Sequence, residues 1–351
     1  ITDAAFAGWT PLAPNGALGP SSSTSLTWKR NKWPLKPDVV FDGGNFGRDP
    51  GGTNSDTPPS LQLLTLSNQF PHWHFNLTME TSAATALISR FAASIYKTYP
   101  NIWPEMVRAL IVHSAEWTEE MKSLVNLANK TERESLLRIV GYGIPNLEQA
   151  EKSASNSLNL LIQDKISPFT IKGKMNELRL HKLPWPKDAL EKLGELPVRM
   201  RVTLSYFIEP DPNTRGWDYK YRYSSYGFRF QVKRPGDSLK EFRARVNAAS
   251  RDEDDDASYG GDYEEWYFGK NPRSKGSIHS DFWEGTAADL ASREYLAVYP
   301  TSGWWKEKDI KQNEHRFARY ALVVSISTPS EEHDIYTLVD NEIRILVDVE
   351  T

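Results

Sequence analysis

The chain has 351 residues, of which 39 % are apolar and 25 % are charged, a composition typical of globular proteins and not of disordered or fibrous ones. The net charge is −4, which argues against nucleic acid as a partner, and the absence of Cys excludes disulfide scaffolds, thiol catalysis and Cys-based zinc sites. No apolar run is long enough to cross a bilayer, so no membrane partner is expected, and the length predicts two domains.

The first half of the chain carries mostly helical periodicity. The segment 38–41 is a short apolar run closed by two glycines, which predicts an inner strand of a parallel sheet. From Ala84 onward the apolar residues follow one stripe of a helix that ends at Pro100. A helix buried on most sides is expected from Pro104 to Val112, and an amphipathic one over 119–128. This half is therefore predicted to be α/β.

Near residue 165 the period of the apolar residues changes to two. Alternation of apolar and polar side chains predicts strands over 198–208, 228–232, 318–326 and 343–349. Strands with one polar face and no helices between them favour an antiparallel, jelly-roll-like sandwich. We therefore expect an α/β domain over 1–165 and an all-β sandwich domain over 166–351.

The segment Glu80–Ala86 lies where a loop enters the helix that begins near Ala84. A Ser at a helix N-terminus projects its hydroxyl from the helix end, and its own N–H is free to act as an oxyanion donor. The helix dipole favours negative charge at that end, and small neighbours let a substrate backbone come close. Ser82 is thus a candidate nucleophile. The alternative is that Thr81 or Ser82 only caps the helix, as most such residues do.

Four blocks in order over about residues 15–150 resemble the subtilisin-like serine peptidases, or subtilases. Ser21–Ser23 followed by Leu35–Val40 is similar to the Ser-rich turn and the Lys-Pro-Asp-hydrophobic strand of that family. Glu80–Ala86 is similar to its nucleophile motif, Gly-Thr-Ser-Met/Ala-Ala-x-Pro/Ala, and Pro104–Leu110 resembles the helix that follows. Gly141–Asn146 resembles the Gly-Tyr-Gly segment that closes the catalytic domain.

The resemblance implies a serine endopeptidase with a Ser–His–Asp triad. Ser82 would be the nucleophile that forms an acyl-enzyme, and its N–H would supply part of the oxyanion hole. In the family the triad Asp, the triad His and an oxyanion Asn precede the Ser, but too little chain precedes Ser82 to hold them. We therefore expect 1–165 to be the C-terminal part of a subtilase catalytic domain. The missing groups would come from an N-terminal portion of the same peptidase or from a separate chain, and the first residue, Ile1, fits a fragment or a processed chain.

Glu80 departs from the family pattern, which has Gly at this position. A carboxylate turned toward the oxyanion site would disfavour the negative intermediate. Our hypothesis is that Glu80 points away or restrains activity, so Glu80 and Thr81 are candidate modulators. The alternative function is a catalytically inactive subtilase-like protein that acts as an interaction or regulatory module through its β-sandwich.

The resemblance also suggests partners. The pattern is similar to bacterial subtilases that are paired with an AAA+ ATPase in phage defence, which implies a cytoplasmic enzyme acting on protein or peptide substrates. No cofactor is expected. A calcium site is conceivable at the acidic run 252–256, but a solvated loop is the commoner role of such a run.

Other residues of catalytic type are interpreted as structural. In an extended segment Ser280 points away from His279 and Asp281, so these three residues can form no relay. His72 and His74 lack a third metal ligand at a persuasive spacing, and His113 is expected to be a buried, hydrogen-bonded residue. The 12 Trp are assigned to packing, with a binding surface for sugars or peptides as the alternative.

Overall fold

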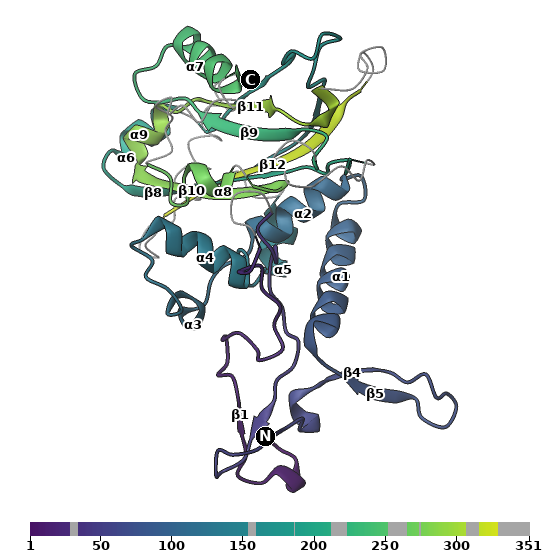
Figure 1. Cartoon of the computed structure of the whole chain (residues 1–351). Coiled ribbons are helices and arrows are strands. Elements are labelled where there is room, and N and C mark those ends of the chain that lie inside the picture. Colours follow the sequence, from purple (N-terminus) through teal and green to yellow (C-terminus); the bar gives the residue numbers. More distant parts are fainter. Residues whose placement is uncertain are drawn as a thin grey trace. The chain divides into compact units, whose positions relative to one another are not determined.

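The computed structural model describes residues 1–28, 34–153, 159–185, 187–211, 223–251, 265–273, 275–306 and 316–328 (Figure 1). These residues form two compact units that interleave along the chain. The first unit comprises residues 1–28, 35–100 and 114–148, and the second comprises the described residues of 29–34, 101–113 and 149–351. The segment 101–113 therefore folds with the C-terminal residues. The predicted domain boundary near residue 165 stays a prediction.

The first unit combines helices with short antiparallel strands. Its helices are α1 (Glu80–Thr98), α3 (Glu119–Lys122) and α4 (Lys130–Val140), with single 3₁₀ turns at Ala4–Phe6 and Pro59–Leu61, and α5 (Leu147–Lys152) follows α4. Its strands are β1 (Thr10–Pro11), β2 (Gly47–Arg48), β3 (Ser55–Asp56), β4 (Leu63–Leu66) and β5 (Phe75–Thr78). Strands β1-β2-β3 form one sheet, and β4 and β5 form a hairpin that leads into α1 (Figure 1).

The second unit contains two antiparallel sheets. One sheet has the order β10-β8-β12-β6 and the other has the order β7-β11-β9. Their strands are β6 (Asn159–Ile166), β7 (Arg179–Lys182), β8 (Pro197–Ser205), β9 (Gly227–Val232), β10 (Ile278–Thr286), β11 (Tyr295–Thr301) and β12 (Ala318–Ser327). Its helices are α2 (Pro104–His113), α6 (Lys187–Leu193), α7 (Leu239–Arg251), α8 (Lys270–Arg273) and α9 (Ala287–Ala291), with a 3₁₀ turn at Trp304–Lys306.

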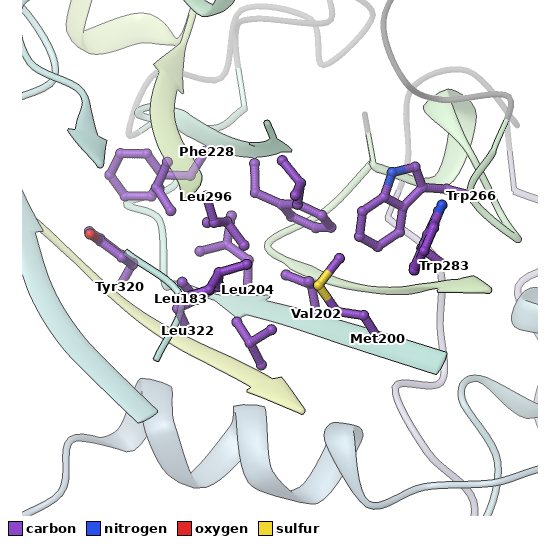
Figure 2. Packing of buried hydrophobic residues seen from close by; sticks show 14 of the residues in the cluster. Leu183, Met200, Val202, Leu204, Phe228, Trp266, Trp283, Leu296, Tyr320 and Leu322 are labelled. Atoms are coloured by element: carbon purple, nitrogen blue, oxygen red, sulfur yellow. The ribbon is translucent and has the colours of Figure 1, made fainter. Parts of the chain in front are cut away.

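The two sheets of the second unit share one hydrophobic core (Figure 2). Val202 and Leu204 of β8 meet Phe228 and Leu296 of the other sheet in this cluster, because alternate residues of a strand face the same side. Trp266 and Trp283 fill one end of the cluster (Figure 2). This packing explains why apolar residues recur with a period of two in the second half of the sequence.

Helices cover the outer sides of both sheets. Helix α2 packs against β8 and β12, and α7 packs against β11. Ala297 and Tyr299 of β11 meet Phe242 and Val246 of α7, whereas the residues between them, such as Val298, face the core. The expectation of an all-β second half is therefore wrong, because helices occur between its strands. The antiparallel sheets are confirmed, and the sandwich as such stays a prediction.

Most of the predicted strands and helices are present in the described residues. The expected strands at 198–208, 228–232 and 318–326 correspond to β8, β9 and β12, and the expected strand at 343–349 lies outside the described residues. Helix α1 begins four residues before Ala84 and ends before Pro100. Helix α2 is buried on most sides, as predicted.

Three expectations for the first half need correction. The segment 38–41 forms no strand, because Val40 N–H donates to the Gly143 carbonyl (3.0 Å) and the Asp38 carbonyl accepts from Tyr142 N–H (2.9 Å) without a continuing ladder. All strand pairs of the described residues are antiparallel, so the predicted parallel sheet is not observed.

The amphipathic helix expected over 119–128 is only one turn long, because α3 ends at Lys122. The helix that the sequence reading missed is α4, for which Asn129 is the N-cap and accepts a hydrogen bond from Thr131 N–H (2.9 Å). Glu132, three residues after the cap, accepts from Asn126 N–H (2.6 Å). An Asn followed three residues later by Glu is a start signal that could have predicted this helix.

Candidate functional site

The candidate site is the beginning of α1. The residue before the helix, Met79, has extended backbone angles and makes no capping hydrogen bond with its side chain. Glu80, the first helical residue, has a φ of 72°, and it is the one non-glycine residue in the described parts of the chain with a positive φ. Left-handed backbone angles favour Gly because they carry a steric cost for residues with a Cβ. The family's Gly at this position therefore matches the backbone conformation that this chain adopts with Glu.

Ser82 lies in the first turn of α1 and is exposed to solvent. Neither its hydroxyl nor its N–H makes a hydrogen bond with any residue that the structure describes. An unpaired N–H is expected there, because the first N–H groups of a helix have no carbonyl one turn earlier. An exposed hydroxyl and an available N–H are what the nucleophile hypothesis requires.

The capping alternative is not supported. A capping residue precedes the helix and accepts a hydrogen bond from its first turn. Thr81 and Ser82 lie inside α1, after Met79 and Glu80, and neither side chain accepts such a bond. Thr81 contributes its carbonyl, which accepts a hydrogen bond from the Thr85 hydroxyl (2.7 Å).

Helix α1 is anchored by one apolar face. Ala83, Phe91 and Ile95 are buried, and the ring of Phe41 packs edge-on against Phe91 with 6.3 Å between ring centroids. The segment 38–41 thus contacts the helix through the Phe41 side chain, although it is not a strand of a sheet. The opposite face of the first turn, which carries Ser82, stays open to solvent.

The helix start is also held by a contact that the sequence reading missed. Glu80 N–H donates a hydrogen bond to the Gly43 carbonyl over 2.6 Å. The sequence pattern predicts Gly43 and Gly44 only as the end of a strand. A Gly-Gly pair is a possible signal for a close backbone contact, but the sequence does not show which segment makes it.

Two other family blocks pack together in the same unit. A Cβ at Gly141 would lie 2.4 Å from the Asp38 carbonyl oxygen, and a Cβ at Gly143 would lie 2.1 Å from that of Glu116. Both glycines have positive φ angles, 58° and 100°. The Gly-Tyr-Gly segment therefore depends on glycine for its backbone angles, for the close approach of Gly141 to Asp38 and for that of Gly143 to Glu116.

No described His makes a hydrogen bond with Ser82. His113 is buried in the second unit, where its ring nitrogens lie 2.9 Å from Thr203 Oγ1 and 2.8 Å from Ser325 Oγ. Burial, and then the positive charge of Arg201, lower the pKa of His113 well below its ordinary value. The expectation of a buried, hydrogen-bonded His113 is confirmed.

The sequence His279-Ser280-Asp281 lies in the edge strand β10 and forms no relay. Ser280 Oγ contacts Thr203 Oγ1 (2.7 Å), whereas His279 Nε2 contacts the Tyr206 hydroxyl (3.1 Å). Asp281 is buried and forms an ion pair with Arg273 over 3.0 Å. Burial raises the pKa of Asp281, although Arg273 and three backbone N–H groups act in the opposite direction.

The remaining candidates do not form a site in the described residues. His72 and His74 are exposed in the β4–β5 loop, and no cluster of metal-ligating side chains occurs in the parts of the chain that the structure describes. The acidic run 252–256 lies outside those parts. Trp304 and Trp305 are buried, and both indole N–H groups donate to Glu209, which supports packing and not a sugar-binding surface.

Comparison with known proteins places the candidate site in a recognisable family segment. Residues 3–143 match the model of the subtilase family, Peptidase S8. Over 220 residues, 60 % of this chain, the sequence is 26 % identical to the uncharacterized protein y4bN of Sinorhizobium fredii (strain NBRC 101917 / NGR234). The match covers 46 % of that protein, so the chain spans about half the length of this curated relative. None of the described helices has the length and apolarity needed to span a membrane.

Proposed function

Because residues 3–143 are subtilase-family sequence, we propose that this chain is part of a serine endopeptidase in which Ser82 is the nucleophile. The observation that carries the proposal is the exposed Ser82 at the start of α1, with an unpartnered hydroxyl and N–H among the described residues. A helix N-terminus alone indicates only a place that favours negative charge, whereas the family match supports the role of a nucleophile for the Ser that lies there.

The proposed reaction is acyl transfer in two steps. Ser82 Oγ attacks the scissile carbonyl carbon, and a His general base accepts the hydroxyl proton. The carbonyl oxygen becomes an oxyanion that the Ser82 N–H and the dipole of α1 stabilise. The same His then donates the proton to the leaving amine, and water hydrolyses the acyl-enzyme to release the second product and regenerate Ser82.

The His, its Asp partner and the oxyanion Asn are proposed to come from an N-terminal portion of the peptidase or from a separate chain. The β4–β5 hairpin supports this part of the proposal. Leu64, Leu66, Phe75 and Leu77 lie on one face of the hairpin and are exposed, and the hairpin ends four residues before Ser82. An apolar face of this kind beside a reactive group is typical of a surface that another polypeptide segment covers.

A second candidate function, an inactive subtilase-like interaction module, is favoured by two observations. Glu80 occupies the family's Gly position in a backbone conformation that suits Gly, and no described His contacts Ser82. In this case the second unit would bind a regulatory partner. An AAA+ ATPase is the partner that the family resemblance suggests for the peptidase, and the partner of an inactive module stays open.

Labelling of the full-length protein with a fluorophosphonate probe tests the proposal, because such probes react only with an activated Ser. We expect labelling of wild-type protein, with and without a candidate ATPase and ATP, and its loss in Ser82→Ala. Ser89→Ala is the matched control, since Ser89 lies on the same helix with its hydroxyl bonded to the Thr85 carbonyl (2.7 Å). Absence of labelling under every partner condition would support the inactive module.

The role of Glu80 has its own test. If the Glu80 side chain restrains the site, Glu80→Gly will raise the rate of labelling and of peptide hydrolysis in the full-length protein. Equal rates for the variant and the wild type would remove the restraint hypothesis and leave the nucleophile assignment untouched.

A further inference from the structure

We infer that Gly43 and Gly44 are positioning residues for Ser82, because they clamp the backbone of Met79 and Glu80 at the point where α1 begins. The inference rests on the proposed function only for its catalytic consequence. The clamp itself, a turn of two glycines against the first helical residue, is a structural feature that can be tested separately.

Gly43 makes the direct contact. Its carbonyl accepts the Glu80 N–H over 2.6 Å, and a Cβ at position 43 would lie 2.8 Å from the Glu80 carbonyl oxygen and 3.2 Å from the Glu80 carbonyl carbon. Both atoms belong to the backbone and cannot move away by a change of rotamer. Any residue other than Gly at position 43 would therefore push the first turn of α1 out of place.

Gly44 holds the same turn from the other side. It has a φ of 75°, and a Cβ there would lie 2.8 Å from the Leu61 carbonyl oxygen and 3.2 Å from the Cβ of Met79. Its N–H donates to Asp42 Oδ1 over 2.9 Å, and the next residue, Asn45, donates to the Leu61 carbonyl over 2.9 Å. The turn is thus fixed to the chain before the hairpin, and it leaves too little room for a Cβ beside Met79, the residue that precedes α1.

The clamp holds Glu80 in an unusual conformation. A φ of 72° is disfavoured for Glu, and no side-chain cap stabilises this helix end, so the hydrogen bond to Gly43 is the contact that defines the path of the chain here. Ser82 follows two residues later in the same rigid turn. Its orientation is therefore set by the backbone at position 80. A displacement of about 1 Å at a catalytic group can reduce a rate on the order of 100-fold.

Gly43→Ala tests the clamp, and Gly51→Ala is the matched control. Gly51 is an exposed glycine of the same unit whose added Cβ would approach no atom closer than 3.6 Å. We expect the maximal rate of fluorophosphonate labelling of full-length Gly43→Ala to fall by about tenfold or more, while the half-saturating probe concentration changes little. Gly51→Ala should label as the wild type does.

Amide hydrogen exchange of the same proteins gives a readout that does not depend on activity. Gly43→Ala should speed exchange of the Glu80 N–H, which donates to the Gly43 carbonyl, but not of the last turns of α1 or of β8. Unchanged exchange of the Glu80 N–H would overturn the clamp even if wild-type protein is never labelled. If wild-type and Gly43→Ala proteins label equally fast, the two glycines do not position Ser82, whatever the exchange result, and the proposed function stands.

A second pair of variants covers the case in which Gly43→Ala fails to fold. Glu80→Val places a β-branched residue where φ is positive, and Glu80→Gly relieves the strain while keeping the N–H that binds Gly43. We expect Glu80→Val to label about tenfold or more slowly than Glu80→Gly. Equal labelling and equal exchange in the first turn for the two variants would show that the backbone at position 80 does not orient Ser82.

Discussion

The β4–β5 hairpin of the first unit and the β8–β12 pair of the second unit are both rich in apolar side chains, but only the latter is buried. Leu66 in β4 is 78 % exposed, whereas Leu322 in β12 is 0 % exposed. The strands β8 and β12 face a second sheet across a common core, and α2 covers their other side. The hairpin has no such layer within the described residues.

The difference in exposure between the two strand pairs indicates which unit has an apolar surface available for another polypeptide segment. A two-stranded ribbon has little stability of its own in water, and an apolar face on it is useful only when it is covered. In the second unit, the apolar residues of β8 and β12 are covered by the other sheet and by α2. The first unit presents an apolar hairpin that leads directly to the helix carrying Ser82, so this hairpin is the better candidate for an interface with another polypeptide segment.

The largest effect is expected for the buried ion pair of the second unit. Asp281→Ala removes the buried carboxylate that pairs with the buried guanidinium of Arg273 and should lower the unfolding free energy of this unit by about 3–5 kcal/mol. Glu284→Ala, on the same strand but in an exposed pair with Arg199, should cost less than about 1 kcal/mol. Hydrogen exchange of β8 and β12 measures the loss of unfolding free energy in both variants. Similar losses would show that burial does not make the Asp281–Arg273 pair more important for stability than the exposed Glu284–Arg199 pair.

A direct test of the comparison uses two leucines. Leu322→Ala should lower the unfolding free energy of the second unit by about 2–5 kcal/mol, because it removes a fully buried side chain from a closed core. Leu66→Ala should change the stability of the first unit by no more than about 0.5 kcal/mol, as is usual at exposed positions. The comparison breaks down if hydrogen exchange of β4 and β5 shows that Leu66→Ala costs as much as Leu322→Ala.

Acid should weaken the second unit before the first. The pKa values of buried His113 and His279 lie well below 6.5, so well above pH 6.5 these residues are neutral in both the folded and the unfolded state and contribute nothing to pH dependence. As pH falls below 6.5, His113 and His279 become protonated in the unfolded chain but stay neutral in the folded unit. The unfolding free energy then falls by up to about 1.4 kcal/mol per pH unit for each His.

Urea denaturation followed by Trp fluorescence between pH 7 and 5 measures this slope. His113→Gln and His279→Gln should each flatten the slope. A wild-type stability that stays constant down to pH 5 would contradict the prediction, since both groups must then be protonated in the folded state as readily as in the unfolded one.

The smallest effect is expected at the start of α1. Glu80→Gly removes the steric cost of a positive φ and should stabilise the first unit by about 1 kcal/mol. Glu120→Gly, in the helical turn α3, should instead destabilise it by a similar or smaller amount, because Gly is a poor helix former. Opposite signs in hydrogen exchange of the two helices are the expected outcome, and a loss of stability in Glu80→Gly would show that the Glu80 side chain makes contacts that outweigh the strain.

The elements predicted correctly from the sequence are those whose pattern is long and regular. Helix α1 has a repeated apolar stripe, and β8 and β12 alternate over many residues. Ser82 is a candidate because its neighbours resemble a family motif, and the structure adds that it is exposed in the first turn of α1. The elements that were missed have weak local patterns. Helix α4 has only a capping signal at its start. Segment 38–41 is as apolar as a strand, but its backbone hydrogen bonds with described residues go only to residues 142 and 143, and it therefore joins no sheet.

The sequence by itself determined that a Ser stands in the first turn of an amphipathic helix, and that apolar alternation in the second half builds antiparallel strands. Both are local properties of a few consecutive turns or strand residues. Only the tertiary structure decided that α2 folds with the C-terminal residues, that Glu80 has a positive φ and donates its N–H to Gly43, and that no described residue covers the apolar face of the hairpin. These features depend on contacts between residues far apart in the chain, which no local pattern specifies.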